Sequence, residues 1–382
     1  MEQAFVKNDM MVWCLSAVFI MSLAITGLLI PKILLIAYRK NLFDIPDARK
    51  IHTSRVPRLG GIAFVPAIII SIAMIFGLSE SDTVIRSGDI AEPSMPFGIC
   101  GLLLLYITGI SDDLIGERYK AKLAMQIAAA GLMLCSGLCI CNLHGFWGIY
   151  DWPQWSAYIL TALVVVFIVN AINLIDGIDG LASGLSAVAC AFFGVVFACS
   201  GNTFHALLSF ATLGTIVPFF YYNVFGNEKM RRKIFMGDTG SLCIGFILAY
   251  LAVSMSDVHI RGVFSGFNPI VVAFSPLLVP CLDVLRVFIH RLRFHRSPFM
   301  PDCSHIHHKL LALGLSAPKA MAMIIAISAI LVAVNVLLSA SVNVTYLMAG
   351  DIGIWILFNI ALTRRILHLR HIRRLPSNGS FL

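Results

Sequence analysis

The sequence predicts an all-α, polytopic membrane protein with about eleven transmembrane helices, and two observations support this fold class. First, 59% of the 382 residues are hydrophobic and only 13% are charged, whereas a soluble domain carries about 25% charged residues. Second, apolar runs long enough to cross a bilayer recur from one end of the chain to the other. The two-residue alternation that is typical of membrane β-barrel strands does not occur.

The expected helices form one membrane domain, residues 1–362, followed by a basic tail, residues 363–382. The first apolar run has a polar lead and no small-residue cleavage pattern, so we expect it to be retained as a helix. The expected spans are residues 11–37, 60–78, 97–111, 122–143, 154–172, 183–199, 206–222, 240–256, 268–288, 320–341 and 346–362.

The basic residues predict how these helices are oriented. An odd number of spans places the two termini on opposite sides, and alternate loops hold 23 of the 28 Lys and Arg residues. Because cytoplasmic loops are enriched in Lys and Arg, we expect an outside N-terminus and a cytoplasmic C-terminus in the inner membrane. The tail "RRILHLRHIRR" (364–374) is expected to contact anionic lipid, and no nucleic-acid partner is expected.

Polar motifs interrupt the apolar pattern on the predicted cytoplasmic side, beginning with "NAINLIDGIDGLASG" (170–184). Asn173, Asp176 and Asp179 are spaced by three, so one helical turn keeps them near one face. Carboxylates are costly inside a bilayer, and their number here predicts a polar cavity. The alternative is a helix cap with solvated acids.

Two further acidic motifs are "GISDDLIGERYKAK" (109–122) and "RRKIFMGDTGSLCIG" (231–245). Paired carboxylates such as Asp112 and Asp113 can bind a divalent cation or share a proton. Adjacent helical residues point about 100° apart, so we expect them to have different roles. Asp238 stands between two glycines before an apolar helix that Thr239 or Ser241 could cap. This context suggests Mg²⁺ between Asp238 and a phosphate.

Three histidines occur within four positions in "HRSPFMPDCSHIHHKL" (295–310), namely His305, His307 and His308. Histidine side chains can donate to phosphate or sugar oxygens, which is the favoured interpretation. Zinc is a competing one, because histidine is a common zinc ligand. However, no cysteine partner has zinc-site spacing, and adjacent histidines on a regular helix cannot face one ion. A solvated loop is the third alternative.

A basic motif, "DIPDARKIHTSRVPRLGG" (44–61), precedes a span and contains Arg55 and Arg58. It is either a topology signal alone or an anion site at headgroup depth, suited to a lipid phosphate. All five motifs lie on the side that the Lys and Arg count assigns to the cytoplasm. Carboxylates and cationic side chains at a membrane surface suit a diphosphate that is bound with Mg²⁺ and meets a lipid phosphate.

These motifs resemble those of the polyprenyl-phosphate N-acetylhexosamine-1-phosphate transferases, and the "HIHH" form preceded by "SPFMPD" is similar to the WecA and TagO branch, which is related to MraY. The resemblance covers residues 40–310 in the order of that family. One departure is that many relatives have an Asp shortly after the acidic pair, where this chain offers Glu117 and Lys122. The resemblance rests on six motifs: "RKIHTSRVPRLGG", "SDDLIGERYKAK", "NAINLIDGIDGLASG", "FMGDTGSLCIG", "LDVLRVFIHRL" and "SPFMPDCSHIHHKL".

The resemblance implies transfer of a sugar 1-phosphate, with N-acetylglucosamine 1-phosphate as the default, from a UDP-sugar to undecaprenyl phosphate. UMP is released, and Mg²⁺ is the implied cofactor, with Mn²⁺ as a potential substitute. A homodimer is left open. The implied residues are Asp238 and Asp112 at the metal, Asp112 and Asp113 near the lipid phosphate, Asn173, Asp176 and Asp179 at the nucleotide, His305, His307 and His308 in the histidine motif, and Arg55 and Arg58 facing phosphate.

The expected chemistry is attack of the lipid phosphate on the β-phosphorus of the UDP-sugar. Asp112 or Asp113 would orient or deprotonate the acceptor, although a phosphate monoester with a second pKa near 6 has little need of a base. A covalent aspartyl-phosphate route is an alternative. A rival function of another class is a transporter or channel for anionic substrates, because intramembrane acids also mark such pathways.

Overall fold

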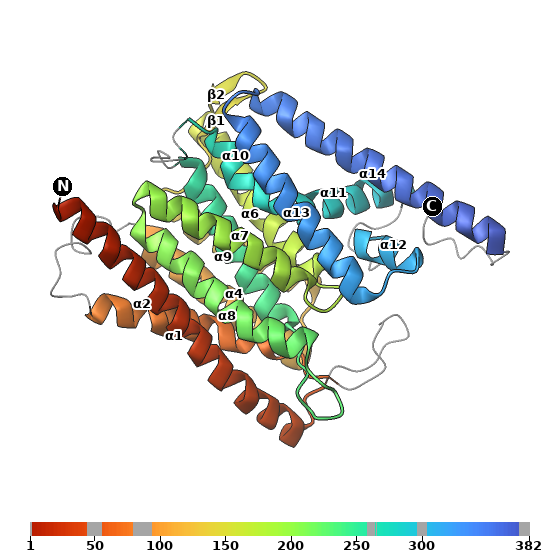
Figure 1. The fold of residues 1–382 in the computed structure, drawn as a ribbon, viewed down its shortest axis with the longest axis horizontal. Helices are drawn as coiled ribbons and strands as arrows, with labels where there is room; N and C mark the ends of the chain where they lie inside the picture. The colour runs from red at the N-terminus through yellow and green to blue at the C-terminus, as the bar shows by residue number, and fades with distance from the viewer. Residues whose placement is uncertain are drawn as a thin grey trace.

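The computed structural model describes residues 2–43, 56–78, 94–257, 264, 266–295 and 304–373, which form a bundle of long helices (Figure 1). The elements of its first half are α1 (Glu2–Lys40), η1 (Gly60–Ala63), α2 (Phe64–Leu78), α4 (Ser94–Ile115), α5 (Tyr119–Cys135), β1 (Asn142–Phe146), β2 (Ile149–Asp151) and α6 (Gln154–Ile175). Those of its second half are α7 (Leu181–Ser200), α8 (Thr203–Val224), α9 (Gly237–Asp257), α10 (Pro269–Phe274), η3 (Ser275–Leu277), α11 (Leu278–Arg293), α12 (Ile306–Ala312), α13 (Ala317–Ser339) and α14 (Val344–Arg373).

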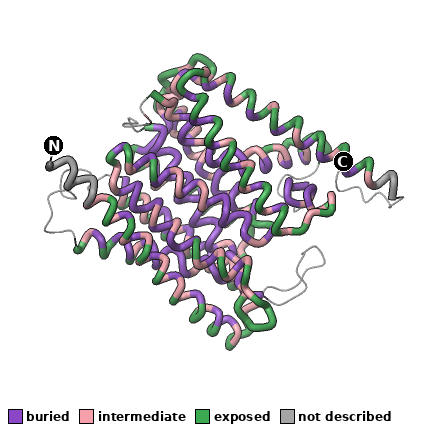
Figure 2. Tube along the Cα trace, in the orientation of Figure 1, coloured by how far each residue is buried: buried purple, intermediate pink, exposed green. Residues whose placement is uncertain are grey.

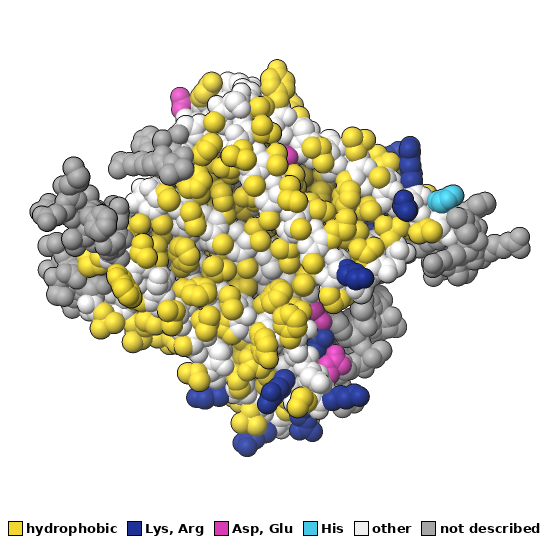
Figure 3. All heavy atoms as spheres, viewed as in Figure 1, with side chains coloured by type: hydrophobic (Ala, Val, Ile, Leu, Met, Phe, Trp, Pro, Cys, Tyr) yellow, Lys and Arg dark blue, Asp and Glu magenta, His cyan; other side chains and the backbone are white. Residues whose placement is uncertain are grey.

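The helices confirm the prediction of an all-α, multi-pass membrane protein. Within the described ranges, ten helical segments are long and apolar enough to cross a membrane. Hydrophobic side chains cover most of the face in Figure 3, and Lys and Arg side chains gather at its lower and right edges. The outside N-terminus, the domain boundary at residue 362 and the homodimer remain predictions, and α14 continues past that boundary to Arg373.

The expected span 122–143 is the one that differs most from the structure. Helix α5 has 17 residues and ends at Cys135, and Gly137 follows with a positive φ of 89°. The chain then forms a hairpin in which β1 and β2 pair antiparallel, with Asn142 opposite Asp151. The apolar content of this region predicted one long helix, because hydropathy alone does not distinguish a helix end from a short strand.

Helix α9 forms the centre of the bundle (Figure 2), and the whole of its apolar segment is buried. It packs against α4 on one side and α6 on another. Two glycines permit these approaches: a β-carbon at Gly245 would lie 2.8 Å from the Cα of Val169, and one at Gly109 would overlap the backbone of Thr239. The polar C-terminal ends of α4 and α6 are thereby held beside the N-terminus of α9.

The expected span 268–288 consists of three consecutive pieces. The short helix α10 leads through the 3₁₀ turn η3, which contains Pro276, into α11, which continues to Arg293. Proline lacks a backbone N–H and interrupts a regular helix, which accounts for the break. Helix α11 lies beside the short helix α12, and its polar face supplies the residues that contact the histidine motif.

Candidate active site

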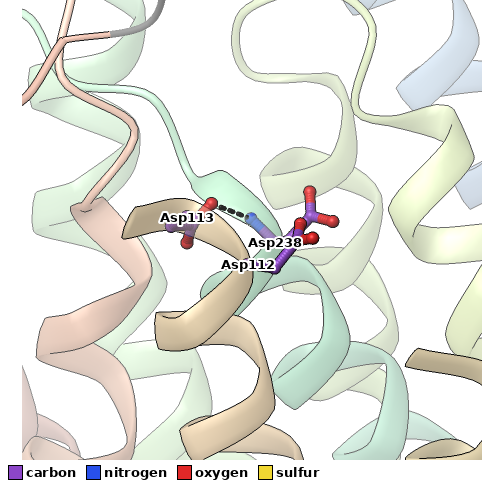
Figure 4. A group of neighbouring side chains, drawn as sticks. All are labelled: Asp112, Asp113 and Asp238. Carbon is purple, nitrogen blue, oxygen red and sulfur yellow. Dashed lines mark hydrogen bonds between the residues drawn. The ribbon is translucent and has the colours of Figure 1, made fainter. Parts of the chain in front are cut away.

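Three carboxylates meet where α4 ends and α9 begins (Figure 4). One oxygen from each of Asp112, Asp113 and Asp238 lies within 4.8 Å of the others, which is close enough to share one metal ion. Asp112 and Asp113 point apart, as expected for neighbours on a helix, with Asp112 beside the Asp238 side chain. The structure therefore brings together the two acidic motifs, which are more than 120 residues apart in the sequence.

Asp113 caps the N-terminus of α9. Its Oδ1 accepts from the backbone N–H of Asp238 at 2.8 Å, and its Oδ2 accepts from the N–H of Thr239 at 2.9 Å and from the Thr239 hydroxyl at 2.6 Å. Neither of the two candidate caps, Thr239 and Ser241, caps this helix: their hydroxyls donate to Asp113 and to the Gly237 carbonyl. A carboxylate from α4 satisfies these N–H groups and complements the positive end of the helix dipole.

Asp112 faces a loop that folds back over it. Its Oδ1 accepts from the backbone N–H of Glu117 at 2.7 Å, and Lys122 Nζ donates to its Oδ2 at 2.9 Å. The same ammonium group also contacts the carboxylate of Asp238. Lys122 thus bridges two of the three carboxylates, and its charge offsets the repulsion between them.

The basic motif is held against the start of α9 by backbone pairing. Phe235 N–H donates to the Pro57 carbonyl at 2.8 Å, and Gly61 N–H donates to the Met236 carbonyl at 2.8 Å. Arg58 lies in this paired segment, and its positive charge acts on both Asp176 and Asp238. Arg55 lies outside the described residues, so its expected role remains a prediction.

The loop after α6 carries the second group of acids. Asn173 donates to the Ser241 hydroxyl at 2.8 Å, which ties the end of α6 to α9. Asp179 forms an ion pair of 2.8 Å with Lys233 from the segment between α8 and α9. The expectation that these residues share one helical turn is wrong for Asp176 and Asp179, because α6 ends at Ile175 and the motif continues as a loop.

Asp176 lies within electrostatic reach of other charged groups of the site. Its side chain is exposed to solvent, yet the surrounding protein removes enough water to raise its pKa to about 7. The Arg58 guanidinium opposes this rise, while the charges of Asp179, Asp238 and Asp113 add to it. The same electrostatic neighbourhood therefore includes two members of the acidic triad, the basic motif and the loop.

The histidine motif packs against this loop through His307. A β-carbon at Gly177 would overlap the imidazole of His307, so only glycine leaves room for that ring. His307 is 1% exposed, and neither of its ring nitrogens has a hydrogen-bond partner among the described residues. Burial lowers its pKa to about 3, so the ring is neutral at physiological pH. The His308 ring lies beside it, with a centroid distance of 4.2 Å.

Residues 95–256 of the chain match glycosyl transferase family 4, a range that includes the triad and the loop after α6. The chain is also 33% identical over 309 residues to undecaprenyl-phosphate alpha-N-acetylglucosaminyl 1-phosphate transferase of Salmonella typhi, covering 79% of this chain and 77% of the relative. The chain belongs to glycosyl transferase family 4. A second relative is the decaprenyl-phosphate N-acetylglucosaminephosphotransferase of Mycolicibacterium smegmatis, with 31% identity over 76% of this chain and 73% of the relative.

Among the His, Cys, Asp and Glu side chains in the described ranges of this family 4 chain, Asp112, Asp113 and Asp238 form the group that can hold a metal ion. The histidines make other contacts: His305 bonds to Asp283, and His307 packs on Gly177. No observation on these residues favours the zinc interpretation.

Sequence reasoning assigned no role to Lys122, Lys233 and Asp283, each of which contacts a predicted site residue. All three lie within motifs that the sequence displays, but a lysine among many predicted cytoplasmic lysines carries no distinguishing signal. Asp283 did carry a signal, because it is an acidic residue within an apolar span. Such a residue is rarely placed there without a partner.

Proposed function

We propose that this family 4 chain transfers N-acetylglucosamine 1-phosphate from UDP-N-acetylglucosamine to undecaprenyl phosphate and releases UMP. The reaction starts a lipid-linked glycan at the inner membrane of a bacterium. The observation that carries the proposal is the triad of Asp112, Asp113 and Asp238 beside Arg58 and Lys122, in a chain that shares three quarters of its length with relatives named for this transfer.

The oxygens of the triad fit a hard divalent cation. Mg²⁺ prefers oxygen ligands and usually binds through one or two carboxylates together with substrate phosphates. Asp112 and Asp238 would hold it, because Asp113 already accepts three hydrogen bonds from α9. When bound, Mg²⁺ neutralises negative charge on the donor diphosphate. Mn²⁺, which has similar ligand preferences, would be a substitute.

The residues of the chain then position two anions for an in-line displacement. An oxygen of the acceptor phosphate attacks the β-phosphorus of the donor, and the bond from that phosphorus to the bridging oxygen of UMP breaks. One phosphoanhydride replaces another, so positioning and charge neutralisation supply most of the rate enhancement. Asp112 orients the acceptor, Lys122 and Arg58 offset the charge on the reacting phosphates, and Asn173, Asp176 and Asp179 face the nucleotide.

The histidine motif completes this arrangement. His307 has two buried ring nitrogens without a partner in the described residues, and buried polar atoms are normally hydrogen-bonded, so a substrate oxygen is a candidate partner for one of them. His305 and His308 flank it. We assign these imidazoles to oxygens of the sugar or of the transferred phosphate, and Arg55 to the same charged group.

An apolar cavity offers a place for the lipid chain of the acceptor. It has a volume of about 510 Å³ and is lined by side chains of α6, α10, α11, α14 and the β1–β2 hairpin, including Leu282 and Leu285. Helix α11 therefore presents apolar side chains to this cavity and Asp283 to the histidine motif. A prenyl chain is wholly apolar, so it would bury its surface there without any unpaired polar group.

The transport alternative has no supporting observation in the described residues. The experiment that tests the proposal combines purified protein, undecaprenyl phosphate, Mg²⁺ and a panel of UDP-N-acetylhexosamines that are radiolabelled in the sugar. We expect label from UDP-N-acetylglucosamine to enter the lipid fraction with stoichiometric UMP. Folded protein that transfers label from no donor would overturn the proposal.

A further inference from the structure

Asp283 is a fully buried carboxylate on α11, within a segment that is otherwise apolar enough to cross a membrane. Burying an ionised group is costly unless other groups pair with it. Asp283 has three such partners: Arg286 Nη2 at 3.0 Å, His305 Nδ1 at 2.9 Å and the backbone N–H of Ile306 at 3.1 Å. Two of these partners belong to the start of the histidine motif.

Asp283 and Arg286 together hold the chain where α12 begins. His305 occupies the N-cap position of α12 but offers no side-chain cap of its own, and Asp283 accepts the first helical N–H instead. Arg286 Nη2 also donates to the Ser304 carbonyl. Two side chains of α11 therefore hold residues 304–306: Asp283 accepts a hydrogen bond from this segment, and Arg286 donates one to it.

The contact with Asp283 also determines which nitrogen of His305 carries a hydrogen. A carboxylate beside an arginine is ionised and only accepts hydrogen bonds, so Nδ1 of His305 is the donor. The remaining polar atom of the ring is then Nε2. A carboxylate that holds a histidine in this way fixes both its tautomer and its orientation.

The orientation of the His305 ring is matched by that of His307, the next histidine of the motif. The rings of His305 and His307 are nearly parallel, with an interplanar angle of 7° and a centroid distance of 5.8 Å. His307 in turn fills the space beside Gly177. The other end of α12 is tied to α14, because Lys309 Nζ donates to Asn359 at 3.2 Å and to Thr363 at 3.0 Å. Helix α12 is thus held by α11 and by α14 while the His307 imidazole packs on the loop after α6.

We infer that Asp283 is a positioning residue for the transfer reaction, which acts through His305 by fixing its tautomer and by holding α12 against the loop at Gly177. Arg286 supports it by pairing with the carboxylate and with Ser304. This inference rests on the proposed function for its kinetic consequence, but the contact between Asp283 and α12 can be tested independently.

The kinetic test is a double-mutant cycle with Asp283→Asn and His305→Ala. Asp283→Asn should lower kcat/KM by about 10- to 100-fold, as is typical when the carboxylate partner of a functional histidine is altered. Asp283 also accepts from the backbone N–H of Ile306, which His305→Ala leaves in place, so the double variant should lose less than the product of the two single losses but more than His305→Ala alone. Losses that multiply in the double variant would overturn the inference.

The structural test is hydrogen exchange at residues 304–313, followed by mass spectrometry. An asparagine cannot replace both carboxylate oxygens as acceptors, so Asp283→Asn should accelerate exchange at the start of α12 by about tenfold or more. Unchanged exchange would show that Asp283 does not hold α12. If the unsubstituted protein transfers no sugar phosphate, the proposed function fails, and this measurement still decides whether Asp283 holds the helix.

A matched control is Asp351→Asn. Asp351 is also a buried carboxylate, 6% exposed, and it pairs with Asn335 at 2.8 Å between α14 and α13. Its substitution should change neither kcat/KM nor hydrogen exchange at residues 304–313. Equal effects of Asp351→Asn and Asp283→Asn would mean that the loss of any buried carboxylate has these consequences, and would contradict the inference. If Asp283→Asn does not fold, Arg286→Lys in the same cycle should give a smaller loss that is reduced in the His305→Ala background. Arg286 Nη2 donates to both Asp283 and the Ser304 carbonyl, and the shorter lysine side chain lacks the rigid planar group that aims these two bonds.

Discussion

The Nζ atom of Lys122 lies 2.9 Å from Oδ2 of Asp112, and the same ammonium group contacts Asp238. Lys122 therefore occupies the space between two of the three carboxylates that can hold a metal ion. A cation bound by Asp112 and Asp238 must share these oxygens with Lys122 or displace it. Displacement would free the ammonium group to contact a substrate phosphate.

Lys122→Met should make the protein depend on divalent cations for its stability. Without the ammonium group the carboxylates repel one another, so the free energy of unfolding in EDTA should fall by roughly 1–3 kcal/mol. Added Mg²⁺ should then raise the melting temperature more than it does in the unsubstituted protein. Thermal unfolding with and without Mg²⁺ measures both effects.

The control for this prediction is Lys120→Met, which removes the same charge from an exposed position two residues away. It should leave the unfolding curves unchanged under both conditions. An Mg²⁺ response of Lys122→Met that equals that of the control would contradict the shared position of lysine and metal.

Asp238→Asn should abolish metal binding and lower kcat/KM by about a hundredfold or more, since a metal ion contributes several kcal/mol of charge stabilisation. Binding is measured by electron paramagnetic resonance with Mn²⁺, and turnover by the transfer assay. Asp257→Asn removes an exposed carboxylate from the opposite end of the same helix and should change neither quantity. Normal turnover in Asp238→Asn would remove this residue from the metal site.

Gly177→Ala should impair turnover, because the added methyl group would overlap the His307 ring and displace α12 from the loop. Overpacking of this kind costs about 1–3 kcal/mol. Gly131→Ala is the matched control: a β-carbon there meets no atom within 4 Å, and alanine in the interior of α5 stabilises a helix by about 1 kcal/mol or less. If both variants turn over at the same rate, the packing of His307 on Gly177 has no functional role.

Asp176→Asn should stabilise the protein more at pH 8 than at pH 5. In the folded protein the pKa of Asp176 is raised to about 7, whereas an aspartate in the unfolded chain has a pKa of about 3.9. The unfolded chain therefore releases this proton first, and the native state loses stability as pH rises from about 4 to 7. An asparagine removes that loss, so the gain in melting temperature should grow with pH. A gain that is equal at both pH values would contradict the raised pKa.

Much of the fold followed from the sequence because long apolar runs in a membrane protein have few alternatives to helix. The spans that became α4, α6 and α9 were predicted to within a few residues of their observed ends. The β1–β2 hairpin was missed, because its five- and three-residue strands are too short for a periodic pattern.

The candidate site was predictable as a set of motifs but not as a set of contacts. The sequence indicated that Asp112 and Asp113 have different roles, and Asp113 indeed caps α9 while Asp112 faces Lys122. Which residue caps α9 depends on the close approach of α4 at Gly109, and such an approach cannot be derived from spacing along the chain. Likewise, the pairing of Asp283 with His305 crosses from one helix to another over 22 residues.

The measurement that tests the central claim most directly uses UDP-N-acetylglucosamine labelled with ³²P at the β-phosphate. The purified protein is incubated with this donor, undecaprenyl phosphate and Mg²⁺, and the lipid and aqueous fractions are counted separately. Attack at the β-phosphorus predicts that ³²P enters the lipid and that UMP is released. Recovery of all ³²P in water-soluble UDP, with the sugar on the lipid, would mean that the sugar moves without its phosphate and would contradict the proposed reaction.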